Sequence, residues 1–255
     1  MKKNVYLIIL TVVTVLCVII GSCYHIVGWG VSFLSHLPFV SSSERESAGQ
    51  VIDKNGVDLD AFDTINVDTD VAELNLVSGD TYSISISASK KLVPEYEVSD
   101  GTLTIKHTTH VHNLIGTKKC KITVTVPEAL DTIDISSAVG DVTLTDIEAN
   151  EVTLSADVGD LNINSCNFQS VAIDANVGDT DLQNIVFTDM EITSDVGEVD
   201  ISTGDLNGYE IDLETDIGEV DVNNRNYRKN YYADGSGTGR LSVSNSTGDI
   251  DLDMH

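Results

Sequence analysis

The sequence predicts an all-β protein: a parallel β-solenoid with coils of about 19 residues, preceded by one N-terminal transmembrane helix. Three observations carry this prediction: a long apolar N-terminal segment, a later alternation of apolar and polar residues, and a [Val/Ile]-Gly-[Asp/Glu] motif that recurs every 19 residues. Alternation with a period of two is typical of strands with one buried face. A fixed period of this length indicates stacked repeats.

The N-terminal segment is apolar enough to cross a membrane. No Asp, Glu, Lys or Arg lies between Lys3 and Glu44, and about 20 helical residues span a bilayer core. We therefore predict an anchor over residues 5–34 and a tether over residues 35–50. Because Lys2 and Lys3 precede the anchor, the positive-inside tendency places residues 1–4 in the cytoplasm. The protein is then a single-pass protein of the cell membrane with an extracytoplasmic C-terminal domain.

The cysteines leave two questions open. Ile19-Ile20-Gly21-Ser22-Cys23 has the spacing of a lipobox, so a lipoprotein attached through Cys23 is an alternative to an uncleaved helix. Against it, apolar residues continue as far as Val40, whereas a lipidated cysteine is usually followed by a polar tether. Cys120 and Cys166 lie in the outer part, where an oxidising compartment would let them pair. Two buried free thiols are the alternative.

Residues 51–130 form an N-terminal β-segment in this prediction. Apolar and polar residues alternate in short runs, which predict strands at 64–68, 73–76, 83–87, 102–105 and 121–126. Val77-Ser78-Gly79-Asp80 separates two of these runs and predicts a hairpin turn. Pro127 lacks the N–H that a strand ladder needs, so we expect the segment to close there.

The repeats occupy residues 131–222, which we predict to be the solenoid. Four motifs lie 19 residues apart, a fifth follows after 21, and a degenerate Thr-Gly-Asp lies near the end; their glycines are Gly140, Gly159, Gly178, Gly197, Gly218 and Gly248. We expect these glycines to adopt a positive φ or to make a close backbone contact at a sharp turn.

Two pairs of mainly apolar positions accompany each motif, and we expect them to form buried files. The residues two and four after the glycine are Val142, Leu144, Leu161, Ile163, Thr180, Leu182, Val199, Ile201, Val220 and Val222. The second pair in each unit is Val152 and Leu154, Val171 and Ile173, Met190 and Ile192, and Ile211 and Leu213. One unit is too small to bury its own apolar face, so units must stack.

An antiparallel sandwich of hairpins is the alternative fold, because it also has strands every 8–12 residues. It gives no reason for a strict 19-residue spacing, which favours the solenoid. Residues 223–255 break the period. For them we expect an irregular loop followed by a C-terminal capping strand at Leu241–Ser244.

Several of these features together resemble a known family. They are the apolar N-terminal helix, the pattern Val71-Ala72-Glu73-Leu74, the strand Gly101-Thr102-Leu103-Thr104-Ile105 and the glycine repeats. This combination resembles the bacterial putative-adhesin family of β-strand repeat proteins, whose function is unknown and some of whose members are associated with Lia-type cell-envelope stress operons. The resemblance implies an envelope-facing β-solenoid and supplies no catalytic residues.

The chain is strongly acidic, with 41 Asp and Glu against 14 Lys and Arg and a net charge of −27. Nucleic acid is therefore excluded as a partner, because phosphate binding needs a basic surface. Acidic residues recur at three positions relative to the glycine. The position one after it holds Asp141, Asp160, Asp179, Glu198 and Glu219. The position three after it holds Thr143, Asn162, Asp181, Asp200 and Asp221, and the position two before it holds Asp157, Asn176, Asp195 and Asp216. Stacked coils would align these residues in files on the surface, which are either simply solvated or able to bind Ca²⁺ weakly.

Two smaller clusters are candidate sites. His110 and His112 would share one face of a strand, as a transition-metal pair would, but His107 has the other parity and no third ligand is evident. A basic group could contact anionic lipids or wall polymers: Lys90, Lys91, Lys106, Lys118, Lys119 and Lys121. Polar histidines and a solvated charge run are the alternatives.

No catalytic, cofactor-binding or metal-binding residue is assigned, and no common catalytic motif occurs. We expect a non-enzymatic, membrane-anchored surface module, either an adhesin or an envelope-stress sensor. Its expected partners are the membrane through the helix, and cationic peptides, wall polymers or envelope proteins. The alternatives are a polysaccharide-acting β-helix enzyme and a purely structural envelope spacer.

Overall fold

A computed structural model describes residues 51–107 and 119–255, and every regular element in them is a β-strand. Within these residues the structure contains no helix with the length and hydropathy needed to span a bilayer. The predicted cytoplasmic N-terminus, anchor and tether lie outside the described residues and stay predictions. His110, His112 and Lys118 lie outside them too.

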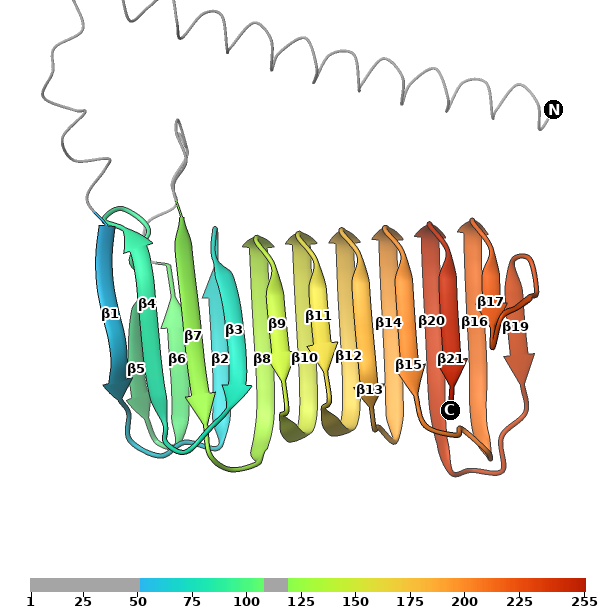
Figure 1. The fold of residues 1–255 in the computed structure, drawn as a ribbon, viewed down its shortest axis with the longest axis horizontal. Coiled ribbons are helices and arrows are strands. Elements are labelled where there is room, and N and C mark those ends of the chain that lie inside the picture. Colours follow the sequence, from blue (N-terminus) through green and yellow to red (C-terminus); the bar gives the residue numbers. More distant parts are fainter. Residues whose placement is uncertain (1–50, 108–118) are drawn as a thin grey trace, which may run out of the picture. The chain divides into compact units, whose positions relative to one another are not determined.

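Two large sheets face each other across one apolar core (Figure 1). In sheet A the parallel strands follow the order β7 (Cys120–Val126), β3 (Glu73–Ser78), β9 (Val142–Thr145), β11 (Leu161–Asn164), β13 (Thr180–Ile185), β15 (Val199–Thr203), β21 (Ile250–Met254) and β17 (Val220–Val222). In sheet B they follow the order β6 (Thr102–Lys106), β2 (Thr64–Thr69), β8 (Leu130–Val139), β10 (Glu148–Val158), β12 (Asn167–Val177), β14 (Asp189–Val196), β20 (Gly239–Thr247) and β16 (Tyr209–Ile217). Each rung is one strand of sheet B followed by one strand of sheet A.

The register confirms the 19-residue coil. Val152 of β10 pairs with Val171 of β12, and Leu161 of β11 pairs with Thr180 of β13. All of the positions predicted to be interior are buried, from Val142 to Val222. The paired strands within the repeat are parallel, as a solenoid requires and a sandwich of hairpins does not.

Each motif forms a tight arc from sheet B to sheet A, and its glycine is required there. Gly159 has a φ of +145°, and a Cβ at this position would lie 2.3 Å from the carbonyl oxygen of Gly140. Arcs of successive rungs are therefore in backbone contact, and both reasons predicted for the glycine hold. The opposite turn places Asp146, Ser165 and Asn184 at positive φ, 19 residues apart.

The parallel stack begins earlier than the predicted boundary at residue 131. Strands β2 and β3 form a full rung next to β8 and β9, and Ala72 occupies the place of the motif glycine against Gly140. The predicted hairpin over residues 77–80 is wrong. Strand β3 pairs with β7 and not with the following strand β4 (Ser83–Ser89), because β7 occupies the edge between them.

The C-terminal strand does not cap the stack, which corrects the prediction for Leu241–Ser244. Strand β20 lies between β14 and β16, and β21 lies between β15 and β17. The reason is that the chain turns back after β17 and covers the outer edges with two antiparallel strands, β18 (Arg225–Asn226) and β19 (Asn230–Ala233). The last two strands of the chain, β20 and β21, therefore pair inside the stack and not at its edge.

The other end of the stack is closed in the same manner. Strand β5 (Glu95–Ser99) pairs antiparallel with β6, β4 pairs antiparallel with β7, and β1 (Val51–Asp58) pairs antiparallel with β4. Antiparallel strands at both ends limit further parallel stacking by other chains, since an uncovered edge is a template for association.

Candidate functional site

The acidic residue after each glycine is part of the fold. The backbone N–H of Asp160 donates to Oδ1 of Asp141 at 3.0 Å, and the N–H of Asp179 donates to Oδ1 of Asp160 at 3.0 Å. The N–H of Glu198 continues this ladder to Asp179 at 2.9 Å. Sequence reasoning treated this file as solvated charge or a weak Ca²⁺ surface and missed its hydrogen bonds, although the acidic residue at every motif was the available signal.

The file two residues before the glycine spaces its charges. In spatial order it contains Asp157, Asn176, Asp195, Ser246 and Asp216, so a neutral residue follows each aspartate except the last. Asn176 donates from Nδ2 to Oδ1 of Asp157 at 3.0 Å. Insertion of β20 places Ser246 between two aspartates and so lowers the repulsion between them.

The file three residues after the glycine brings its charges together. Register places Asp181, Asp200, Asp251 and Asp221 side by side on the outer face of sheet A. The insertion of β21 causes this crowding, because it places Asp251 between Asp200 and Asp221, which were already in the predicted file. Four neighbouring strands thus present four carboxylates at the strand spacing of about 4.8 Å.

Glu198 completes a convergent group, here called the acidic cluster: Glu198, Asp200 and Asp251. One carboxylate oxygen from each lies within 4.8 Å of the other two. Glutamate is one methylene longer than the aspartate found at this place in earlier motifs. Among the described residues, the backbone N–H of Asp249 does not donate to the Glu198 carboxylate as the ladder would require. This carboxylate is therefore available to the cluster.

The cluster is electrostatically strained. Burial, and after it the neighbouring carboxylates of Glu198, Asp251 and Asp181, together raise the pKa of Asp200 to about 6. Burial is also the largest cause that raises the pKa of Glu198 and of Asp251. Within the part of the chain that the structure describes, no lysine or arginine forms an ion pair with these three side chains.

A surface hollow adjoins the cluster. Its volume is about 420 Å³, and it is lined by Asp200, Asp221, Asn224, Asp251 and Asp253. All five side chains carry oxygen, the donor atom that Ca²⁺ prefers. Sequence reasoning missed Asp251, although its position three residues after Gly248 of the degenerate motif was a signal that could have found it.

Comparison with known proteins identifies the family. The family model described as Toastrack DUF4097 matches residues 62–255. The chain belongs to this Toastrack family. No curated protein matches the chain.

Two solved structures show what the Toastrack chain resembles in fold. A putative cell adhesion protein from Clostridium sporogenes is 16% identical with a TM-score of 0.41, and the match covers 81% of this chain and 99% of that one. A putative adhesin from Bacteroides fragilis is 19% identical with a TM-score of 0.44, and the match covers 82% of this chain and 99% of that one. Both likenesses concern the fold alone.

The other residues singled out in the Toastrack sequence have structural partners. His107 accepts at Nδ1 the backbone N–H of Asp70 at 3.1 Å, and its Nε2 lies 2.8 Å from the carbonyl oxygen of Leu92. Since Nδ1 accepts, Nε2 carries the proton and donates. Both ring nitrogens hold loops together, so His107 does not offer a free metal ligand.

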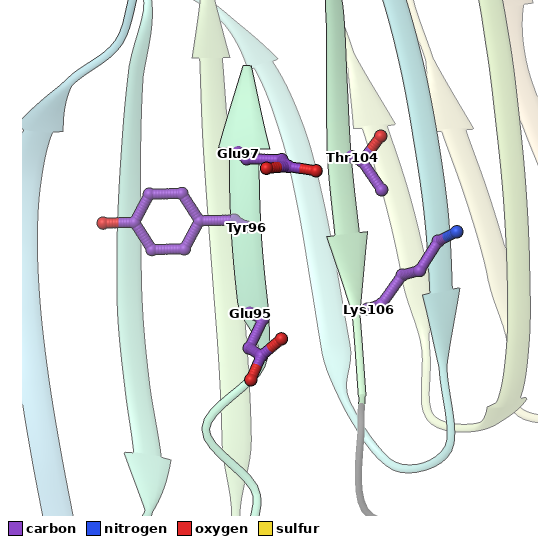
Figure 2. Close-up of a pocket in the computed structure, with 5 residues that line it drawn as sticks. All are labelled: Glu95, Tyr96, Glu97, Thr104 and Lys106. Carbon is purple, nitrogen blue, oxygen red and sulfur yellow. The ribbon is translucent and has the colours of Figure 1, made fainter. Parts of the chain in front are cut away.

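The predicted basic group is partly neutralised. Lys121 pairs with Glu73 at 2.5 Å, and this contact lowers the pKa of Glu73. Lys106 stands opposite Glu95 in the β5–β6 pairing and helps to line a hollow of about 370 Å³ with Tyr96, Glu97 and Thr104. Figure 2 shows Glu97 directed toward the neighbouring strand that carries Thr104, and Tyr96 directed the opposite way. This hollow carries both signs of charge.

The two cysteines of the described residues are buried and unpaired. Cys120 lies on β7 and Cys166 lies just before β12. Burial raises the pKa of each thiol to about 11. Of the two alternatives left open by the sequence, the structure shows free thiols.

Proposed function

We propose that this Toastrack chain is a non-enzymatic, membrane-anchored module of the cell envelope, an adhesin or a stress sensor, that binds cationic ligands on the outer face of sheet A. The acidic cluster carries this proposal. Burial and neighbouring carboxylates raise the pKa of all three cluster residues, and no lysine or arginine of the described residues pairs with them. A bound cation would relieve this repulsion.

Calcium is the inorganic ligand that the cluster suits. Ca²⁺ accepts six to eight oxygens in flexible geometry, whereas Mg²⁺ demands a near-ideal octahedron and keeps its waters. The exposed position of Glu198 and the half-buried positions of Asp200 and Asp251 suit a weak surface site. The same carboxylates would attract cationic peptides through their field.

A binding role is favoured over polysaccharide hydrolysis by the way the carboxylates are arranged. A glycosidase needs two carboxyl groups on either side of a bound sugar. Here the carboxylates follow one repeat position along one exposed sheet face. The predicted N-terminal helix would tether the domain to the membrane, within reach of wall polymers and envelope proteins.

Calcium binding is tested on the full chain in nanodiscs of zwitterionic lipid. At about 1 mM, a concentration typical of extracellular Ca²⁺ sites, Ca²⁺ should raise the Tm of the wild type by mass action. Asp200→Asn with Asp251→Asn should abolish that increase, and Glu198→Asp should reduce it. The matched control, Asp174→Asn with Glu191→Gln, removes two exposed acids from sheet B and should keep the increase. An equal increase in the cluster variant would sink the calcium assignment.

The partner is tested by capture from envelope fractions with the nanodisc-embedded chain, with and without Ca²⁺. We expect a bound envelope component that Asp200→Asn with Asp251→Asn releases. If nothing is retained in either condition, the adhesin and sensor roles are both wrong.

A further inference from the structure

A second surface runs along the edge of the solenoid where the glycine arcs lie. The residue before each motif glycine points outward in successive rungs, and together these form the valine edge: Val139, Val158, Val177, Val196, Thr247 and Ile217. Four of the valines are 45–48% exposed, and Ile217 is 59% exposed. The strands that carry them end at one common edge in Figure 1.

This exposure is systematic. The two predicted pairs of apolar positions are buried, whereas in the six rungs with the glycine motif this position is aliphatic in five and exposed in all. Register aligns the side chains into one continuous stripe at the strand spacing of about 4.8 Å. Contiguous exposed apolar surface is typical of interaction sites.

Acidic side chains flank the valine edge along the chain on both sides. Asp157, Asp195 and Asp216 precede the aliphatic residue, and the carboxylates of the hydrogen-bonded ladder follow it after the glycine. All of these flanking acids are exposed. The occupant must therefore combine an aliphatic face with positive charge on either side, because like charges would repel it.

The spacing selects a helix as that occupant. An α-helix advances 5.4 Å per turn, so side chains on one face recur at nearly the spacing of the rungs, about 4.8 Å. Five intervals of the edge measure about 24 Å, the length of roughly 16 helical residues. An extended strand lying along the edge repeats its side chains on one face at about 6.7 Å, which matches the rung spacing less well than the pitch of a helix does.

We propose that the valine edge docks a basic amphipathic helix of a partner protein. The helix would lay its aliphatic stripe on the valine edge and direct lysine or arginine side chains to the flanking acids. The stripe is narrow, so the interface belongs to the small and transient class, and its affinity should weaken with salt. A second copy of this chain is a poor occupant, since its own edge carries the same negative charge.

This inference rests on the proposed function in one respect, that the chain is a binding module. It concerns a different surface from the acidic cluster. The probe is a labelled synthetic helix of about 18 residues, a length that slightly exceeds the edge, with leucines on one face and flanking lysines. Binding is measured by anisotropy against the full chain in zwitterionic nanodiscs, with empty nanodiscs as the blank. A scrambled peptide of the same composition separates amphipathic docking from simple charge attraction.

The native chain itself suggests the variants. Thr247 already occupies the valine edge, so Val158→Thr, Val177→Thr and Val196→Thr together should fold, and they should weaken peptide binding at least tenfold. Asn176 already occupies the file before it, so Asp157→Asn, Asp195→Asn and Asp216→Asn should weaken binding about tenfold at low salt. The matched control removes three exposed acids from sheet B, Glu151→Gln, Asp174→Asn and Glu191→Gln, and should stay within about twofold.

Four outcomes overturn the proposal: no binding to the wild type, equal binding of the scrambled peptide, no effect of the threonine substitutions, or self-association of the chain that those substitutions abolish. The last outcome would assign the edge to a second copy. The Ca²⁺ effect on Tm is measured on the same samples. A wild-type chain that does not bind the peptide but keeps its Ca²⁺ response therefore overturns the helix inference alone.

Discussion

The backbone N–H of Asp160 donates a 3.0 Å hydrogen bond to Oδ1 of Asp141, its counterpart one rung earlier. The bond recurs from Asp179 to Asp160 and from Glu219 to Asp249. A residue type that looked like surface charge therefore satisfies a backbone donor at the arc. The carboxylate gives this exposed amide a fixed acceptor and so adds one hydrogen bond between successive rungs.

This ladder predicts different effects of two substitutions at one position. Asp160→Ala removes the acceptor for the exposed amide of Asp179 and should lower the free energy of unfolding by about 0.5–1.5 kcal/mol. Asp160→Asn keeps a carbonyl oxygen and should lower it by less than about 0.5 kcal/mol. Urea unfolding of both variants measures the difference. Equal losses would show that charge matters and the acceptor does not.

Asp200 predicts an unusual pH dependence. Its folded pKa of about 6 lies above the ordinary value of 3.8, so the folded state holds the proton more tightly than the unfolded chain. The contribution of Asp200 to stability is favourable at low pH and is lost as the pH rises from about 4 through 6.

Asp200→Asn should therefore raise the stability at pH 7 by about 1 kcal/mol, allowing for solvent screening of a half-exposed group. At pH 4 the same substitution should have almost no effect. Calorimetric Tm values of the variant and the wild type at both pH values test this. A variant that is destabilised at pH 7 would contradict the strained cluster.

Gly159 predicts a severe effect of one added methyl group. A Cβ there would lie 2.3 Å from the Gly140 carbonyl oxygen, at a φ of +145°. Gly159→Ala should cost on the order of 3 kcal/mol or more. The control is Gly204→Ala, where no heavy atom lies within 4 Å of the added Cβ. Similar unfolding midpoints for the two variants would show that the arcs can move apart.

The inserted C-terminal rung predicts that truncation removes a central layer and not a cap. A chain ending at Thr238 loses four buried apolar side chains: Leu241, Val243, Ile250 and Leu252. At about 1.5–3 kcal/mol each, the loss is on the order of 6–12 kcal/mol, comparable with the whole stability of a domain. A chain ending at Asp253 keeps all four and should fold. Circular dichroism of both chains decides whether this holds.

The buried thiols predict slow alkylation. Iodoacetamide at pH 8 should leave Cys120 and Cys166 unmodified in the native protein, because each has a pKa of about 11 and is buried. Both should react once the chain is denatured, as peptide mass spectrometry would show. A disulfide between them in the native protein would contradict the structure.

The sequence alone determined the elements that depend on near neighbours in the chain. The alternation around Val152 and Leu154 predicts a strand with one buried face, and the 19-residue spacing of Gly159 and Gly178 predicts stacked arcs. Both predictions hold because burial of one strand face and close packing at the arc act at every repeat. The glycine repeats, with the apolar N-terminus and the segments near Val71 and Gly101, also carried the resemblance to the putative-adhesin repeat family, which the Toastrack match confirms.

Only the tertiary structure decided which edges pair. Strand β21 lies between β15 and β17 because β18 and β19 return along the outer edges, and such edge covering depends on segments far apart in the sequence. That choice sets Asp251 between Asp200 and Asp221 and so creates the acidic cluster. It also places Thr247 within the valine edge. The sequence determined which residue types face outward, and the order of the rungs determined which of them meet.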